Sequence, residues 1–393
     1  MRFIHTSDWH IGRLFQNISL LDDQLFVLKQ IKQYAKDYNV DALIVAGDIF
    51  DRSVPPAEAV DALNNFFQQI EDELAIPIIM ISGNHDSAKR LRFGAKQMQK
   101  SGLHILADVK AVTEPVLVNT DTDTVAFYGI PYHDPVEVRE AFASDDLESP
   151  IKTYDDAHTF LANKVLAHKN EHHKNMPAVL LSHCFIDGAS ESDSERPLSI
   201  GGADRVSWQP LVDFDYVALG HLHGPQYKGA EHIRYSGSLM KYSFSEHKQK
   251  KGVTLVEINS DGLVKQEHLA IKVKHDLRIV EGSLEEIINA GKVDERNNDY
   301  ILAKISDSQV ILDPIGRLRQ VYPNVLQIER TNFDNVSNSR LSNNGSLGQA
   351  NERSETEVFN DFFKQVMAVE LSNEQLELLQ QTVSEAKADM EAK

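Results

Sequence analysis

The sequence predicts an α/β protein whose main domain is a β-sandwich of two mixed sheets flanked by helices. Three observations support this prediction. Strand-like and helix-like patterns alternate over the first 135 residues, further β-type segments occupy residues 112–130, 253–258 and 264–271, and a second βαβαβ pattern begins near residue 272. We therefore expect a main domain over residues 1–271, a small α/β capping domain over 272–333, a flexible linker over 334–353 and a helical pair over 354–393.

Within the main domain, short apolar runs predict the strands and helical spacing predicts the helices. Leucine and isoleucine residues recur on one face of residues 20–38, which predicts a helix there. Two more helices are expected, over residues 57–74 and 88–99. The apolar runs that predict strands lie at residues 2–6, 42–46, 78–81, 179–181 and 216–219.

Each of these five runs is followed by side chains of the types that can bind metal ions. In α/β sheets ligands bind beyond the carboxyl ends of the strands, so we expect these side chains to converge. Taken singly each motif is weak, and residues 83–86 would suit an ordinary turn. Their joint occurrence in this order predicts a centre with two metal ions. The candidate ligands are Asp8, His10, Asp48, Asn84, His183, His221 and His223.

The chemistry of this set is specific. Carboxylate, imidazole and amide oxygen ligands without thiolate suit Mn²⁺, Fe²⁺, Mg²⁺ or Zn²⁺. Two such ions, about 3.5–4 Å apart, stabilise the attacking and leaving oxygens of an in-line phosphoryl displacement and activate a shared water. Asp48 follows the second strand, between the loops of Asp8 and Asn84, and is the expected bridging carboxylate.

The motif series Asp-x-His, Gly-Asp-x-x-Asp, Gly-Asn-His-Asp, His and Gly-His-x-His resembles the calcineurin-like metallophosphoesterase superfamily. Residues 6–12, 45–52 and 220–223 resemble more narrowly the SbcD family of bacterial nuclease subunits, and residues 196–203, 235–238 and 242–244 strengthen that match. The resemblance implies two divalent ions, Mn²⁺ in the first place. It assigns Asp8, His10, Asp48 and His223 to one ion, and Asp48, Asn84, His183 and His221 to the other.

The resemblance also places His85 beside the scissile phosphate without making it a ligand. An imidazole there can stabilise the charged transition state or protonate the leaving oxygen. Asp86 follows and is a candidate to orient His85. Asp51 is a candidate to orient a ligand from behind and Arg52 to contact phosphate, with an ordinary loop role as the alternative for each.

The function that the resemblance implies is a DNA nuclease, acting as a double-strand exonuclease and a hairpin or single-strand endonuclease in repair, replication and recombination. The partner would be an SbcC-type ATPase. A homodimer through helices near residues 57–100 would lie within a heterotetramer. Capping boxes at Ser354-x-x-Glu357 and Ser372-x-x-Gln375 predict two C-terminal helices. These would bind the ATPase, with packing onto their own chain as the alternative.

Composition bounds these expectations. The formal net charge of −19 argues against a domain that grips DNA alone, unless metals or a partner supply positive charge. The same charge is compatible with a second function, a phosphatase or phosphodiesterase for small substrates. A third possible function is that of a non-catalytic scaffold. The single Cys184, and the lack of a signal peptide or membrane span, indicate a cytoplasmic protein with a small buried cysteine. The polar loop 184–206 is either functional or disordered.

Overall fold

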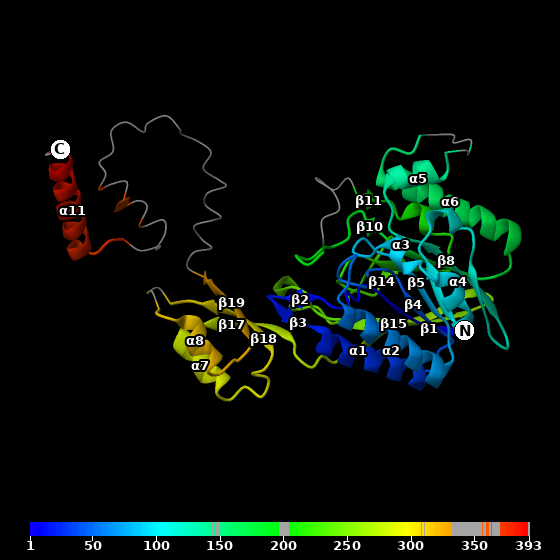
Figure 1. Cartoon of the computed structure of the whole chain (residues 1–393), viewed down its shortest axis with the longest axis horizontal. Helices are drawn as coiled ribbons and strands as arrows, with labels where there is room; N and C mark the ends of the chain where they lie inside the picture. Colours follow the sequence, from blue (N-terminus) through cyan, green and yellow to red (C-terminus); the bar gives the residue numbers. More distant parts are fainter. Residues whose placement is uncertain are drawn as a thin grey trace. The chain divides into compact units, whose positions relative to one another are not determined.

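The computed structural model describes residues 1–143, 145, 150–195, 204–307, 309, 311–331, 356, 359–360, 363 and 370–391. The chain divides into two compact units, Met1–Asp276 and Leu277–Lys393 (Figure 1). The motif at residues 196–203, the expected linker 334–353 and the capping box expected at Ser354 lie outside the described residues.

The first sheet of unit 1 is mixed. Its inner strand β1 (Arg2–Thr6) pairs in parallel with β4 (Ala42–Val45) on one side and antiparallel with β15 (Gly252–Asn259) on the other. The expected strands at residues 2–6, 42–46 and 78–81 are confirmed, each to within one residue. In spatial order the strands are β16 (Gly262–Ala270), β15 (Gly252–Asn259), β1 (Arg2–Thr6), β4 (Ala42–Val45), β5 (Ile78–Ile81) and β6 (Leu103–Leu106).

The second sheet is also mixed, with parallel pairs in its centre and antiparallel hairpin partners at both edges. In spatial order its strands are β13 (Gln226–Lys228), β14 (Ala230–Tyr235), β12 (Tyr216–Gly220), β9 (Ala178–His183), β8 (Thr124–Ile130) and β7 (Val116–Asn119). Two short ribbons complete unit 1: β2 (Leu14–Phe15) with β3 (Ile18–Ser19), and β10 (Phe185–Ile186) with β11 (Arg205–Val206).

The two sheets pack face to face over an apolar core. The ring of Phe3 on β1 lies edge-on to Phe127 on β8 and to Tyr216 on β12, with centroid distances of 5.3 and 5.7 Å. Ile79 and Ile81 of β5 fill the same core as Leu181 of β9. The predicted β-sandwich of two mixed sheets is therefore confirmed.

Helices cover the outer faces of the sandwich. Helix α1 (Leu21–Asp37) lies beside α2 (Ala57–Leu74), whose Phe66 ring meets Trp9 at 5.7 Å (Figure 1). Helices α5 (Pro135–Ala141) and α6 (Tyr154–His172) pack on the second sheet. No helix among these and the other described segments combines the length and apolar character needed to cross a bilayer.

The single helix expected over residues 88–99 is a misprediction. The segment forms two short helices, α3 (Ala88–Leu91) and α4 (Ala95–Met98). Gly94 separates them with a φ of +75°, a left-handed conformation that stops the helical hydrogen-bond pattern.

Unit 2 contains the predicted βαβαβ pattern. Its three strands are parallel, and Ser283 and Glu286 form a capping box at the start of the first helix. The elements are β17 (Leu277–Gly282), α7 (Leu284–Gly291), β18 (Tyr300–Ile305), α8 (Pro314–Arg319) and β19 (Val325–Arg330). Helix α11 (Asn373–Glu391) begins at the predicted capping box, where Ser372 and Gln375 exchange hydrogen bonds.

Candidate metal centre

The strand-end loops are tied together by backbone hydrogen bonds. The amide of Asp8 donates to the carbonyl of Gly47 at 3.0 Å, and the amide of His10 donates to the carbonyl of Asp48 at 2.9 Å. Strands β9 and β12 pair up to His183 and Gly220, which places His221 and His223 just beyond the ladder. All seven candidate ligands meet at this end of the sandwich, and every one except half-buried Asn84 is buried.

One group of ligand atoms surrounds His10. Its Nε2 lies 3.1 Å from Nε2 of His223, and one donor atom each of Asp8, His10 and His223 lies within 4.8 Å of the others. Ligands bound at about 2.0–2.1 Å to a common ion are roughly 3 Å or a little more apart. The facing imidazole nitrogens have the separation of two ligands on one ion.

A second group surrounds the side-chain oxygen of Asn84. Its Oδ1 lies 2.9 Å from Nε2 of His183 and 3.2 Å from Nδ1 of His221. The Nδ1–H of His183 donates to the carbonyl of Ala46 at 2.9 Å, so its Nε2 keeps a lone pair. An acceptor-rich set of this kind, with neutral imidazoles and an amide oxygen, suits a second divalent cation.

Asp48 lies between the two groups. Its Oδ2 is 3.6 Å from Nε2 of His10 and 3.6 Å from Nε2 of His183. Its other oxygen, Oδ1, accepts a hydrogen bond from the amide of His85 at 2.8 Å. One carboxylate oxygen is thus equally close to a ligand of each group, as a bridging ligand requires.

The backbone at the centre is strained, and glycines make room for the ligands. Asp8, His10, Asp48 and His221 all have positive φ values, of 51°, 47°, 50° and 105°. Such conformations cost free energy and concentrate at functional sites. A Cβ atom at Gly83 would collide with Oδ1 of Asp48, so only glycine permits this approach.

Burial sets the protonation states of the ligands. Burial and the neighbouring Asp48 raise the pKa of Asp8 well above its usual value. Burial and the surrounding imidazoles lower the pKa of His10 and of His221 well below 6.5, which keeps both rings neutral. Neutral imidazoles are the form that binds metal, and cations nearby would stabilise Asp8 as a carboxylate.

His85 borders the centre, and its ring makes no hydrogen bond to any of the seven candidate ligands. Its Nδ1–H donates to the backbone carbonyl of Asp51 at 2.7 Å, and its ring lies edge-on to that of His10, with centroids 4.6 Å apart. The expectation that Asp86 orients His85 is wrong. Both oxygens of Asp86 are taken up by the amides of Ile49, Phe50 and Gly83, each at 3.0 Å.

Asp86 therefore joins two loops that carry candidate ligands and does not orient the ring of His85. Burial, together with the charge of Asp48, raises the pKa of Asp86 to about 7. Its three backbone hydrogen bonds favour the ionised form and oppose that shift.

Asp51 and Arg52 have different surroundings. Oδ1 of Asp51 lies 3.8 Å from Nδ1 of His10 and accepts a hydrogen bond from Arg13 at 3.2 Å. This places Asp51 behind the candidate ligand His10, the position considered from the sequence. Arg52 is exposed. The guanidinium of Arg13, a residue that the sequence did not single out, also lies 4.9 Å from the ring centroid of Tyr242.

The loop after His183 returns to the centre. The amide of His223 donates to Oε1 of Glu195 at 2.7 Å, and Ser194 Oγ lies 2.5 Å from Nδ1 of the same histidine. Glu246 accepts a hydrogen bond from Ser194 and pairs with buried Lys251. No residue pattern in the sequence singled out Glu246 or Lys251, whereas Ser194 lies in the loop 184–206 that was considered functional.

Charge compensation stabilises the ionised form of Glu246. Burial would raise its pKa, but the ammonium of Lys251 and the hydrogen bonds outweigh burial and hold the pKa below its usual range. Cys184, beside His183, is a small buried residue as predicted, and burial raises its pKa to about 12.

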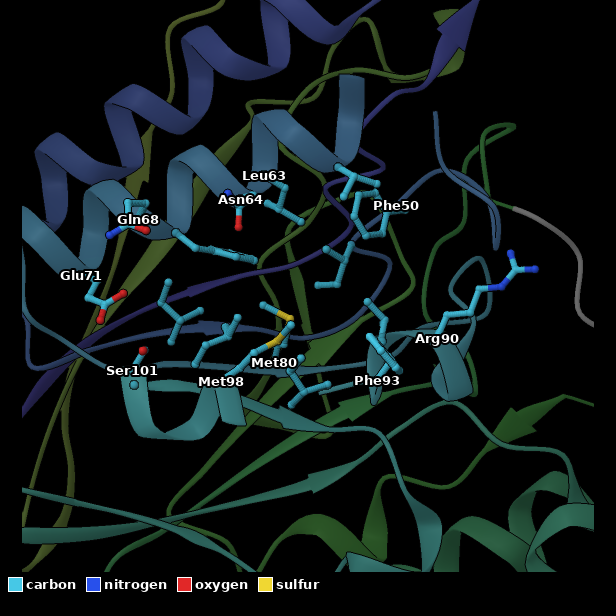
Figure 2. Close-up of a pocket in the computed structure, with 18 of the residues that line it drawn as sticks. Phe50, Leu63, Asn64, Gln68, Glu71, Met80, Arg90, Phe93, Met98 and Ser101 are labelled. Atoms are coloured by element: carbon cyan, nitrogen blue, oxygen red, sulfur yellow. The ribbon is translucent and has the colours of Figure 1, made fainter. Parts of the chain in front are cut away.

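An apolar groove, which none of the seven candidate ligands lines, lies between α2 and the segment around α3 and α4. Figure 2 shows Leu63 of α2 on one side and Met80, Phe93 and Met98 on the other. The cavity has a volume of about 430 Å³. Phe93 is 84% exposed, which is unusual for a large aromatic side chain.

Comparison with known proteins adds four findings. Residues 1–225 match the family model of the calcineurin-like phosphoesterases. Residues 273–367 match a model described as the type 5 capsule protein repressor C-terminal domain. The SbcD component of the nuclease SbcCD from Staphylococcus epidermidis is 33% identical over 384 residues, which are 98% of each chain. A solved dimetal phosphatase from Danio rerio is 10% identical, with a TM-score of 0.40, and the match covers 69% of this chain and 99% of that one.

Proposed function

The chain belongs to the calcineurin-like phosphoesterases and, within them, to the SbcD family, and on that premise we propose that it is a metal-dependent DNA nuclease. It hydrolyses phosphodiester bonds as a double-strand exonuclease and as a hairpin or single-strand endonuclease. It acts with an SbcC-type ATPase in DNA repair, replication and recombination, in the cytoplasm.

The observation that carries the proposal is the position of Asp48, whose Oδ2 is 3.6 Å from a nitrogen of His10 and from one of His183. Asp8, His10, Asp48 and His223 hold one ion in this proposal, and Asp48, Asn84, His183 and His221 hold the other. The ions are Mn²⁺. When bound, such a pair supplies a hydroxide at neutral pH and stabilises the charge that develops on the phosphate.

The protein's own side chains complete the reaction. His85 is fixed through Nδ1, so its Nε2 is free to meet a substrate oxygen. From there it can hydrogen-bond the phosphate or protonate the leaving sugar oxygen. Arg52 is exposed beside this loop and is proposed as a phosphate contact. Asp51 and Asp86 act indirectly, the first beside His10 and the second by joining the loops.

The proposed assembly is a homodimer within a heterotetramer. The groove between α2 and Phe93 supports a second copy of this chain as its occupant, because most of its lining residues fall within residues 57–100 and it exposes apolar side chains. Helices over residues 354–393 bind the ATPase. In the described part of that region, Leu376, Leu379 and Val383 of α11 are only half-buried.

A phosphatase for small substrates is the second candidate, and the net charge of −19 favours it. Such an enzyme needs no basic groove, whereas duplex DNA usually requires one. The nuclease proposal places the missing positive charge on the two bound metal ions and the partner.

The test uses the full chain with Mn²⁺, with and without the SbcC-type ATPase, on end-labelled linear duplex and hairpin DNA. A phosphatase substrate is assayed in parallel. The expected result is metal-dependent cleavage of DNA, together with its loss in an Asp48→Asn variant. Hydrolysis of the phosphatase substrate without DNA cleavage in either condition would overturn the nuclease proposal. The absence of both activities would favour the scaffold.

A further inference from the structure

Three buried polar side chains lie in a row behind His223. Ser194 Oγ is 2.5 Å from Nδ1 of His223, Glu246 accepts a hydrogen bond from Ser194, and Lys251 Nζ is 2.5 Å from Oε2 of Glu246. None of the three is more than 9% exposed. We infer that Ser194, Glu246 and Lys251 are positioning residues that fix His223 in the tautomer needed to bind metal. This inference rests on the proposed metal centre.

The direction of each hydrogen bond follows from the donors available. An ionised carboxylate only accepts, and Lys251 stabilises Glu246 as a carboxylate. Ser194 has one hydroxyl proton, which must therefore point to Glu246. Its oxygen then accepts from His223, so the single N–H of the neutral imidazole is at Nδ1. The lone pair at Nε2 is left facing Nε2 of His10, 3.1 Å away.

Lys251 also fixes the backbone of the same ligand. Its Nζ donates to the carbonyl of His223 at 2.7 Å and to Oγ of Ser238 at 2.8 Å. A buried ion pair is a poor source of stability by itself, because desolvation offsets the attraction. The position of the Glu246–Lys251 pair directly behind a candidate ligand is explained if the pair orders both the ring and the backbone of His223.

The loop that supplies Ser194 is held at three points. Oε1 of Glu195 accepts from the amide of His223 at 2.7 Å, and the amide of Asp193 donates to Oγ of Ser245 at 3.0 Å. Arg13 reaches the carbonyl of Ser194 at 3.5 Å. The segment just before residue 196 therefore belongs to the support of the metal centre.

The test measures Mn²⁺ affinity of the full chain by isothermal titration calorimetry. Ser194→Ala removes the acceptor for Nδ1–H. Glu246→Gln introduces an amide that can donate to Ser194, whose proton would then turn to His223 and move the imidazole proton to Nε2. Each should weaken one of two Mn²⁺ sites by about 10- to 100-fold, the usual effect of losing such a partner. Ser194→Thr keeps the hydroxyl and should retain wild-type affinity.

Two further variants distinguish a failure of this inference from a failure of the proposed metal centre. His223→Ala removes the candidate ligand itself. Glu267→Gln is the control, because it alters a carboxylate on β16 that pairs with exposed Lys265 and not with the residues behind His223. Thermal unfolding of each metal-free variant shows that it is folded. If His223→Ala binds Mn²⁺ like the wild type, the proposed metal centre is wrong. If His223→Ala weakens binding but Ser194→Ala and Glu246→Gln do not, or if Glu267→Gln weakens it equally, the inference is overturned.

Discussion

The Nδ1–H of His85 donates a hydrogen bond to the backbone carbonyl oxygen of Asp51 at 2.7 Å. This bond fixes the ring at the edge of the metal centre and leaves Nε2 without a proton in the neutral imidazole. Nδ1 donates this bond in both the neutral and the protonated ring, so a proton at Nε2 does not disturb the position of His85.

Replacing His85 with alanine tests this role. The variant should bind two Mn²⁺ ions and unfold at a temperature close to that of the wild type, because His85 is only half-buried. Its phosphodiester hydrolysis should fall about 10²- to 10⁴-fold, the usual contribution of a general acid. Metal content is measured by elemental analysis and turnover on labelled DNA. Near-normal turnover with two bound ions would exclude the proposed role.

The apolar groove leads to a prediction about assembly. Replacing Phe93 with aspartate puts a charge into the exposed side of the groove shown in Figure 2. If the groove binds a second copy, dimerisation should weaken at least about tenfold, since buried aromatic anchors dominate many interfaces. Light scattering after size-exclusion chromatography measures the mass over a range of concentrations.

The matched control for the groove is Phe26→Asp on α1, where the native side chain is 40% exposed but does not line the groove. This variant should remain dimeric. A wild-type chain that is monomeric at all concentrations, or a Phe93→Asp chain that dimerises normally, would contradict the prediction.

Local pattern was sufficient to predict most of the fold. The helix predicted over residues 57–74 coincides with α2, and the strand predicted over 78–81 coincides with β5. Strand β9 is longer than its apolar run because pairing with β12 extends it as far as His183. The helix over residues 88–99 failed because the effect of Gly94 depends on its φ, which is not visible in a hydrophobic pattern.

The candidate ligands were predictable because each directly follows a strand, whereas their supports were not. Glu246 and Lys251 lie in a polar stretch that reads as an exposed loop, since charged residues are seldom buried. Their pairing behind His223 depends on tertiary structure. The same holds for Asp86, whose partners Ile49 and Phe50 are on another loop. Whether the seven candidates bind two ions remains a prediction.

Deleting residues 354–393 tests the proposed role of the C-terminal helices. The deletion should abolish binding to the SbcC-type ATPase and leave Mn²⁺-dependent hydrolysis of a simple phosphodiester unchanged, because no candidate ligand lies beyond His223. A finer variant combines Leu376→Asp with Leu379→Asp. Both side chains are half-buried on α11, and the charges should weaken partner binding strongly. Binding is measured by co-purification and calorimetry; intact binding after the deletion would refute the assignment.

The pH dependence of stability can be predicted from His5, which is buried between the sheets. Its Nδ1 lies 2.9 Å from the hydroxyl of Tyr216, and its Nε2–H donates to the carbonyl of Leu219 at 3.2 Å. Burial is the main cause that lowers its pKa to about 3. In the unfolded chain the pKa of a histidine is about 6.5, so between these values the unfolded state binds a proton that the native state does not.

The sign follows directly from that difference. The contribution of His5 is fully present above pH 6.5 and is lost progressively as the pH falls toward 3. The loss amounts to about 1.4 kcal/mol per pH unit well inside this window. Replacing His5 with glutamine should lower stability at pH 7, through the altered hydrogen bonds, but should flatten the decline between pH 6 and 4.5 by roughly that slope. Urea unfolding of the metal-free chain at several pH values measures it, and equal slopes for variant and wild type would show that His5 does not stay neutral in the native state.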